Sequence, residues 1–169
     1  SLPDYVDEFA LIVRRFMAME NLNVIFALIS MGGRIYLIAR SRYAKAMSLQ
    51  LVDAATGRAR ELIAETGKTF VESADLGQRP MVHVLKNGDV LWFSERDGYG
   101  RLYLYDGLTG KLKRPLTQGP WTVRSLLHVD EQAGTVFVAA TREPGPDIDP
   151  YYRNLYRIRL ADGAVTRLT

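Results

Sequence analysis

Residues 102–110 read LYLYDGLTG, and this segment gives the clearest indication of the fold. Two related stretches lie on either side of it, LQLVDAATG at residues 49–57 and LYRIRLADG at residues 155–163. The glycines that close the three stretches are separated by a constant interval of 53 residues. A constant interval of this size indicates a repeated supersecondary unit.

Each stretch belongs to a longer pattern of alternating apolar and polar residues that predicts four antiparallel strands joined by hairpins. Ahead of the stretch come an apolar strand, a tight turn marked by glycine, such as Asn87-Gly88, where positive φ angles are needed, and a second, alternating strand. Behind it comes a more polar strand, which ends in Leu-Thr in the second and third units. The three units are predicted over residues 24–63, 80–117 and 123–169.

We therefore predict an all-β fold, a partial β-propeller of about three four-stranded antiparallel blades. The first two strands of each unit are the most apolar and the fourth is the most polar, as expected when the inner strands are covered on both faces. Open sheet edges and uncovered blade faces predict that the chain forms a homo-oligomer. Residues 1–23 are predicted to be an N-terminal extension, either a short amphipathic helix behind the cap Asp7 or an edge strand.

Composition limits the classes of function. Of the 169 residues, 47% are hydrophobic and 24% are charged, which excludes a disordered or fibrous chain. The net charge is +3 and the basic residues are scattered, so no nucleic-acid partner is expected. The longest apolar run, Leu22 to Met31, is shorter than the roughly 20 residues that cross a bilayer. With no cysteine and two histidines, the sequence predicts no metal site and no cofactor.

The second unit resembles the N-terminal propeller of dipeptidyl peptidase IV-like serine peptidases, in the prolyl oligopeptidase family. The resemblance is carried by VLWFSERDGYGRLYLYD at residues 90–106, by VDEQAGTVFVAAT at residues 129–141 and by RNLY at residues 153–156. It extends in all over residues 48–169. It implies a propeller that caps an α/β-hydrolase domain of the same polypeptide, peptides as substrates, and a periplasmic or secreted location.

The chain carries no predicted catalytic residue. No serine lies in the Gly-x-Ser-x-Gly frame of a nucleophile elbow. The glutamate pair that the resemblance implies for holding a substrate's amino terminus is absent; the nearest acidic doublets are Asp7-Glu8 and Asp130-Glu131. His83 and His128 lie at comparable places in two units, and without a nucleophile and an orienting acid they are interpreted as structural. We expect a non-catalytic segment that gates substrate access to a hydrolase domain, and whether the whole protein is an enzyme is left open.

The turn at Glu95 and Arg96 is a candidate site in the second unit. Exposed charges in a hairpin are usually solvated or paired at the surface, and this is the structural interpretation of the turn. The functional interpretation is that the two residues face the substrate, with Arg96 meeting peptide carbonyls or a carboxylate in the central channel.

A long loop in the third unit is the other candidate site. Asp147 and Asp149 suggest calcium, but the loop lacks the glycine and the closing glutamate of a calcium-binding loop. We predict instead a proline-stiffened interaction loop in which Tyr151 and Tyr152 are aromatic anchors.

Two further functions stay open at this point. A stand-alone propeller-type module would bind a protein partner through loops such as residues 143–154, and it would need no hydrolase domain. A carbohydrate-binding domain would use Trp92, Trp121 or Tyr152 as stacking platforms, and oligosaccharides would then quench the tryptophan fluorescence.

Overall fold

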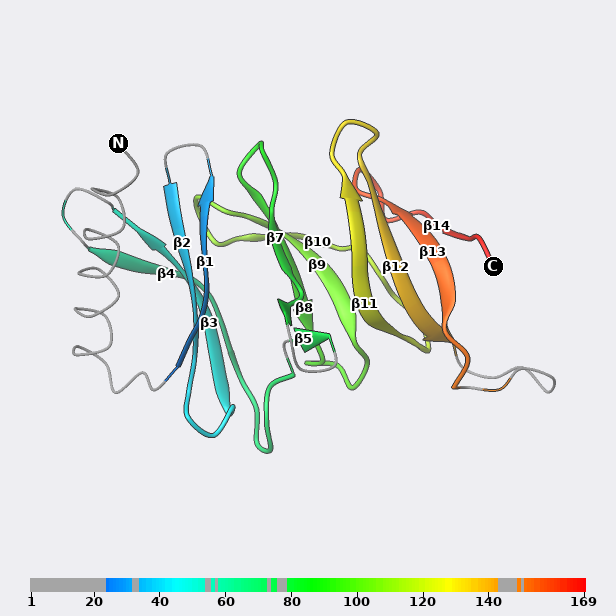
Figure 1. Cartoon of the computed structure of the whole chain (residues 1–169), viewed down its shortest axis with the longest axis horizontal. Helices are drawn as coiled ribbons and strands as arrows, with labels where there is room; N and C mark the ends of the chain where they lie inside the picture. Colours follow the sequence, from blue (N-terminus) through cyan, green and yellow to red (C-terminus); the bar gives the residue numbers. More distant parts are fainter. Residues whose placement is uncertain are drawn as a thin grey trace. The chain divides into compact units, whose positions relative to one another are not determined.

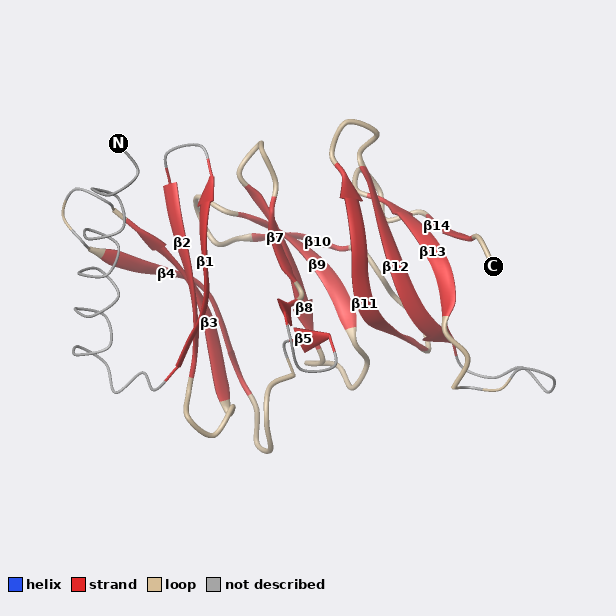
Figure 2. Cartoon of the chain, viewed as in Figure 1, coloured by secondary structure: helices blue, strands red, loops and turns tan. Residues whose placement is uncertain are grey.

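The computed structural model describes residues 24–31, 34–53, 56, 58–72, 74–75, 79–142, 149 and 151–169. This described part of the chain is built from β-strands (Figure 2). None of its regular structure is helical, so no helix in this part could span a membrane. This confirms the all-β prediction, while the predicted extension over residues 1–23 lies outside the described residues. The chain divides into two compact units, Ser1–Val71 and Glu72–Thr169.

The first unit contains a four-stranded antiparallel sheet in which neighbouring strands are consecutive in the chain (Figure 1). Consecutive antiparallel strands are joined by hairpins, as the glycine-marked turns predict. Burial is greatest in the middle of the sheet, where Leu37, Ile38 and Leu49 are completely buried. The strands are β1 (Val24–Met31), β2 (Arg34–Arg40), β3 (Ala46–Val52) and β4 (Ala59–Thr66).

The second unit contains two more sheets of the same design, β7–β10 and β11–β14, together with a short pair of strands, β5 and β6. The fourth strand of each sheet is the exposed one, as predicted from its polar sequence. The strands are β5 (Ala74–Asp75), β6 (Arg79–Pro80), β7 (Val82–Val84), β8 (Asp89–Ser94), β9 (Arg101–Asp106), β10 (Leu112–Pro115), β11 (Trp121–Asp130), β12 (Thr135–Arg142), β13 (Asn154–Arg159) and β14 (Val165–Arg167).

Two strands of the second unit differ from the sequence prediction. The second unit is predicted to begin at residue 80, but the first strand of its sheet, β7, begins at Val82, because Pro80 pairs in the separate strand β6. Strand β11 begins two residues earlier than expected, at Trp121, a residue predicted to lie in the connection between blades. Two register shifts interrupt the pairing of β11 with β12, so its side chains do not alternate regularly, and Leu127 is 54% exposed.

The two sheets of the second unit pack face to face through a continuous apolar core. Alternate residues of β8 and β9 form one side of the core, and alternate residues of β12 and β13 form the other. At one end the backbones meet directly, since Val123 N donates to Gly100 O at 2.8 Å. The core comprises Met81, Leu85, Leu91, Phe93, Leu102, Leu104, Leu116, Trp121, Val123, Val136, Val138, Ala140, Tyr156 and Ile158.

The stretch that repeats every 53 residues is closed by the same backbone hydrogen bond in each sheet. The first residue of the turn donates its backbone N–H across the turn to a carbonyl five residues later. The bonds are Asp53 N to Arg58 O (2.8 Å), Asp106 N to Lys111 O (2.9 Å) and Arg159 N to Ala164 O (3.0 Å). In the second and third turns the closing glycine has a φ of 73° and 74°, a left-handed conformation that other residues rarely adopt.

The Leu-Thr pairs that end the second and third units form a second recurring device. In the second unit, Leu116 N donates to Leu102 O (2.8 Å) and Leu102 N donates to Thr117 Oγ1 (3.0 Å). In the third unit, Leu168 N donates to Leu155 O (2.8 Å) and Leu155 N donates to Thr169 Oγ1 (2.9 Å). Each Leu-Thr pair therefore links the end of the fourth strand to the start of the third by two hydrogen bonds.

Candidate functional site

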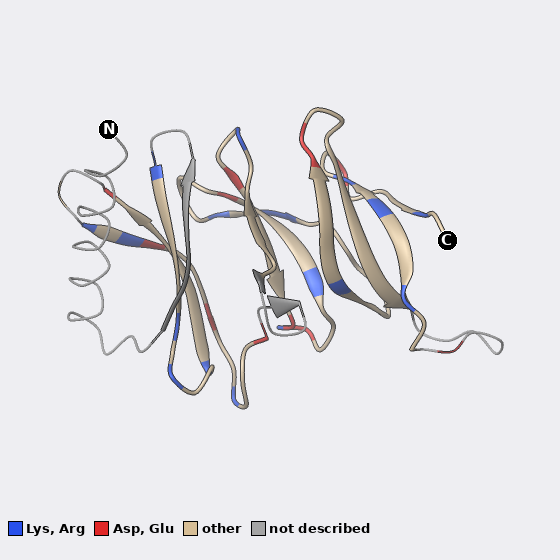
Figure 3. Cartoon of the chain, in the orientation of Figure 1, with Lys and Arg blue, Asp and Glu red and all other residues tan. Residues whose placement is uncertain are grey.

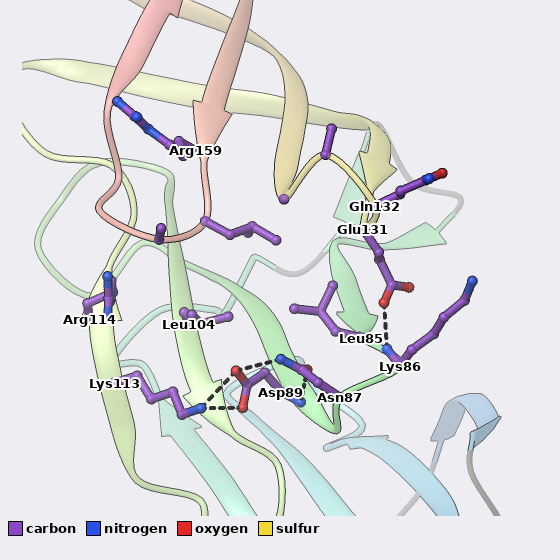
Figure 4. Close-up of a pocket in the computed structure, with 14 residues that line it drawn as sticks. Leu85, Lys86, Asn87, Asp89, Leu104, Lys113, Arg114, Glu131, Gln132 and Arg159 are labelled. Carbon is purple, nitrogen blue, oxygen red and sulfur yellow. Dashed lines mark hydrogen bonds and ion pairs between the residues drawn. The ribbon is translucent and has the colours of Figure 1, made fainter.

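A cleft with a volume of about 800 Å³ lies in the second unit, where turns of its two four-stranded sheets meet (Figure 4). One wall is the β7–β8 turn together with β10, and the other wall is formed by the β11–β12 and β13–β14 turns. The two walls face each other because both sheets are built from hairpins, and the β7–β8 and β11–β12 turns lie at the same end of their sheets. The lining residues are Leu85, Lys86, Asn87, Asp89, Leu104, Lys113, Arg114, Glu131, Gln132, Ala133, Gly134, Arg159, Leu160 and Ala161.

The floor of the cleft holds a nearly buried carboxylate. Asp89 is 8% exposed, and both of its oxygens accept from Lys113 Nζ, at 2.6 and 2.8 Å. Asn87 adds two bonds: its Oδ1 accepts from Asp89 N at 2.9 Å, and its Nδ2 donates to Asp89 Oδ2 at 3.2 Å (Figure 4). A buried carboxylate with this number of partners is satisfied, so we assign this group a structural role.

Glu131 connects the two sheets across the cleft. Its Oε2 accepts from Lys86 N at 2.6 Å, and its Oε1 lies 3.6 Å from His83 Nε2, which is too long for a hydrogen bond. His128, at the comparable position of the next sheet, is exposed, with its ring 6.1 Å from that of Phe137. The two histidines therefore lie in different surroundings.

The cleft carries more positive than negative charge. Arg159 is paired with Asp162 at 3.1 Å, whereas Lys86 and Arg114 make no ion pair with the described residues. Elsewhere, acidic and basic residues are interspersed along the described strands and turns (Figure 3). The cleft could therefore accept an anionic group from solution. No cluster of three histidine or acidic side chains suited to a metal ion occurs within the described residues.

The β8–β9 hairpin places the predicted residues Glu95 and Arg96 in its turn. Arg96 donates from its backbone N and from Nε to Ser94 Oγ, at 3.1 and 2.9 Å. Its guanidinium lies over the ring of Tyr103, 4.5 Å from the centroid, which is the geometry of a cation–π contact. The side chain is therefore held against its own sheet while it remains exposed, and whether it faces a substrate stays a prediction.

The predicted interaction loop is described only in part, and Asp147 lies outside the described residues. Asp149 stabilises a turn: its Oδ1 accepts from Tyr151 N at 2.8 Å and its carbonyl accepts from Tyr152 N at 3.1 Å. Tyr151 is 88% exposed and Tyr152 is 68% exposed. Their exposure suits a contact surface, which stays a prediction.

The tryptophans proposed as sugar-stacking platforms are buried. Trp92 is completely buried, and Trp121 is 8% exposed with its ring 5.2 Å from that of Tyr156. The Trp121 indole N–H donates to Gln118 O. Neither ring face is open to a sugar, which removes the main support for carbohydrate binding.

Sequence reasoning missed the residues that line the cleft. Lys113 and Asp89 lie on strands that do not pair with each other, and Glu131 belongs to the next sheet. The one signal in the sequence was that Lys86 and Glu131 belong to equivalent hairpin turns of successive units. Equivalent turns of stacked sheets lie at the same end, so their charges become neighbours.

Comparison with known proteins supports the resemblance. The family model of the dipeptidyl peptidase IV (DPP IV) N-terminal region matches residues 23–169. Among solved structures, dipeptidyl peptidase 4 from Porphyromonas gingivalis is 26% identical, with a TM-score of 0.67 over 80% of this chain and 18% of that chain.

Two other solved structures show similarity of fold alone. A putative dipeptidyl aminopeptidase IV from Bacteroides ovatus is 21% identical, with a TM-score of 0.64 over 84% of this chain and 22% of that chain. TolB from Acinetobacter baumannii is 18% identical, with a TM-score of 0.54 over 86% of this chain and 32% of that chain. The chain thus spans about a fifth of the two peptidase structures and about a third of TolB.

Proposed function

Since this chain belongs to the family of dipeptidyl peptidase IV N-terminal regions, we propose that it is a non-catalytic propeller segment of a DPP IV-like serine peptidase. The observation that carries the proposal is the family match over residues 23–169, on a chain that folds into three four-stranded antiparallel sheets. The sequence supplies no nucleophile elbow, so the serine chemistry would belong to an α/β-hydrolase domain of the same polypeptide.

The proposed role of the segment is to control access to that domain. A propeller wall admits peptides by size and shape before any bond is broken, so it selects substrates without taking part in the chemistry. The segment would also provide surface for contacts with other subunits. We also propose that the protein is periplasmic or secreted, because the resemblance to DPP IV-like peptidases implies that location.

The first experiment measures the mass of the native protein in its source cells, by immunoblot with an antibody raised against this chain. A band several times larger than 19.0 kDa would support a segment of a peptidase-sized polypeptide. A band near 19.0 kDa would contradict the proposal and favour the stand-alone module. The antibody signal in separated periplasmic, membrane and cytoplasmic fractions tests the proposed location.

The purified chain provides an independent test. We expect it to release no product from a chromogenic Gly-Pro dipeptide substrate, because it lacks the nucleophile. The native polypeptide, captured from the source cells with the same antibody, should cleave the same substrate and should lose that activity with a serine-directed inhibitor. Turnover by the purified chain alone would show that this chain does contain catalytic residues and would contradict the proposal.

The alternative function is a stand-alone protein-interaction module. The observation that favours it is the strong exposure of Tyr151 and Tyr152, at 88% and 68%, beside a turn stabilised by Asp149. Substituting both tyrosines with serine should abolish the capture of a partner by such a module. The same double variant should leave the access role of a propeller segment unchanged.

A further inference from the structure

A second, smaller pocket of about 350 Å³ lies beside the β8–β9 hairpin of the second unit. Its walls come from that hairpin, from strand β9, and from the connection between β10 and β11. Like the cleft in Figure 4, it contains a buried charged side chain, but here one buried nitrogen of that side chain has no hydrogen-bond partner among the described residues. The lining residues are Asp97, Arg101, Tyr103, Pro115, Thr117, Gln118 and Gly119.

Arg101 is the buried cation of this pocket. Its side chain is 7% exposed, although an arginine is rarely buried unless its N–H groups are paired. Its Nε donates to Asp97 Oδ2, and its guanidinium lies 4.9 Å from the ring centroid of Tyr99. Its Nη1 is buried and has no hydrogen-bond partner among the residues that the structure describes.

The hydrogen-bonding groups around Arg101 leave its Nη1 without an acceptor from the protein. Thr117 Oγ1 already accepts from Leu102 N at 3.0 Å. Asp97 accepts from Arg101 through Oδ2 and from Tyr99 N through Oδ1 at 3.3 Å. Gly119 has a φ of 89° and contributes no side chain, so that wall of the pocket stays bare.

Asp97 is the charged partner of Arg101 in this pocket. Burial alone would raise the pKa of Asp97, but the hydrogen bonds from Arg101 and Tyr99 N lower it, so Asp97 is ionised at neutral pH. It accepts from Nε of Arg101, whereas the buried Nη1 of the same guanidinium lacks an acceptor among the described residues.

We propose that the pocket binds a carboxylate group, with one carboxylate oxygen accepting from Arg101 Nη1. A guanidinium N–H and a carboxylate oxygen form a strong charge-assisted hydrogen bond, which a water molecule replaces only in part. The volume suits a small ligand, either a free carboxylate or the carboxyl end of a short peptide. The suggestion that the carboxylate belongs to a peptide rests on the proposed function, whereas the suggestion that the pocket binds a carboxylate does not.

The test is a titration of the full 169-residue chain, observed through the ¹⁵N side-chain NMR signals of its arginines. The three probes are sodium acetate, the dipeptide Gly-Pro and the amide of Gly-Pro, each against sodium chloride at the same ionic strength. We expect the signals of Arg101 to shift with acetate, with Gly-Pro or with both, to reach saturation, and to stay unchanged with the amide. Saturation with acetate alone identifies a free carboxylate as the source, and saturation with Gly-Pro identifies a peptide end.

Variants show whether Arg101 carries the binding. Arg101→Lys keeps the charge but loses the planar fork, and we expect at least tenfold weaker binding. Arg157→Gln removes one positive charge from an exposed position on β13 and should bind as the unchanged chain does. Arg101→Met removes the donor and should abolish the binding. If this variant fails to fold, the titrations of the chain without substitutions and of Arg101→Lys still test the proposal.

Two results would overturn the proposal. One is an Arg101 signal that does not respond to acetate or to Gly-Pro, which would leave water as the occupant of the pocket. The other is equal binding by Arg101→Lys and Arg157→Gln, which would show attraction by net charge alone. Neither result would affect the mass and activity tests of the proposed function.

Discussion

Replacing Thr117 with valine tests the structural role of the Leu-Thr pairs. Thr117 is 1% exposed, and its Oγ1 accepts from the N–H of Leu102, which is completely buried. Valine keeps the shape of threonine but removes the acceptor, so the N–H is left buried and unsatisfied. Such a loss costs about 1–3 kcal/mol of unfolding free energy. For a chain of this length each kcal/mol lowers the Tm by roughly 2–4 °C.

Thr169→Val is the matched control. Thr169 Oγ1 makes the equivalent bond to Leu155 N at 2.9 Å, but Thr169 is exposed and Leu155 is only partly buried. Water can replace the lost acceptor there, so we expect a change within about 0.5 kcal/mol.

The assay is urea unfolding of the 169-residue chain followed by tryptophan fluorescence. Both tryptophans, Trp92 and Trp121, belong to the second unit, so the signal reports on the unit that contains Thr117. Amide hydrogen exchange at Leu102 should also accelerate in Thr117→Val. Equal losses in the two valine variants would refute the reasoning, because burial would then not determine the cost.

Two other substitutions test a steric contact and an ion pair that stabilise the second unit. Gly107→Ala would place a Cβ 2.0 Å from the backbone oxygen of Gly88, and we expect a loss of about 1–3 kcal/mol or more in urea unfolding. Gly98→Ala meets no atom within 4 Å and strains only a φ of 87°, so a cost equal to that of Gly107→Ala would contradict the steric argument. Lys113→Met leaves the carboxylate of Asp89 buried without its cation, and we expect a loss of about 1–3 kcal/mol. Asp89→Asn together with Lys113→Met should recover part of that loss, and no recovery would show that the ion pair is not the cause.

The strands and turns could be predicted because their signals are local. Alternation marks which residues of a strand share a face, and the glycine at the end of each LYLYDGLTG-like stretch marks a turn that needs a positive φ. Where a local signal was misleading, a single residue was the reason. Pro80 has no backbone N–H to donate, and it pairs in β6 instead of beginning β7.

The contacts between sheets could not be predicted in the same way. A Cβ on Gly100 would lie 2.7 Å from the carbonyl oxygen of Val123, in the next sheet. The sequence shows a glycine there but not which backbone approaches it, because that depends on how the two sheets stack. The same holds for Arg101, since nothing local indicates that an arginine at the start of a strand will be 93% buried.

The aspartate that begins the repeated turn allows a test of why the sequence has an aspartate at this position. Asp106 Oδ1 accepts from Thr109 N at 2.8 Å and from Leu108 N at 2.9 Å. These backbone hydrogen bonds, first that of Thr109 and then that of Leu108, lower the pKa of Asp106 below its usual value. In the third unit Arg159 occupies the equivalent position, so its turn lacks this titrating group.

The sign of the pH effect follows from the lowered pKa. The folded chain holds the ionised form of Asp106 more strongly than the unfolded chain does, so this group stabilises the fold above the unfolded pKa of about 3.9. That contribution is lost as the pH falls through the folded pKa, which lies below 3.9. We therefore expect the Thr109 amide signal to shift with a midpoint below pH 3.9. A midpoint for Thr109 at or above 3.9 would mean that the turn does not favour the carboxylate, and the structural reason for an aspartate at this position would be lost.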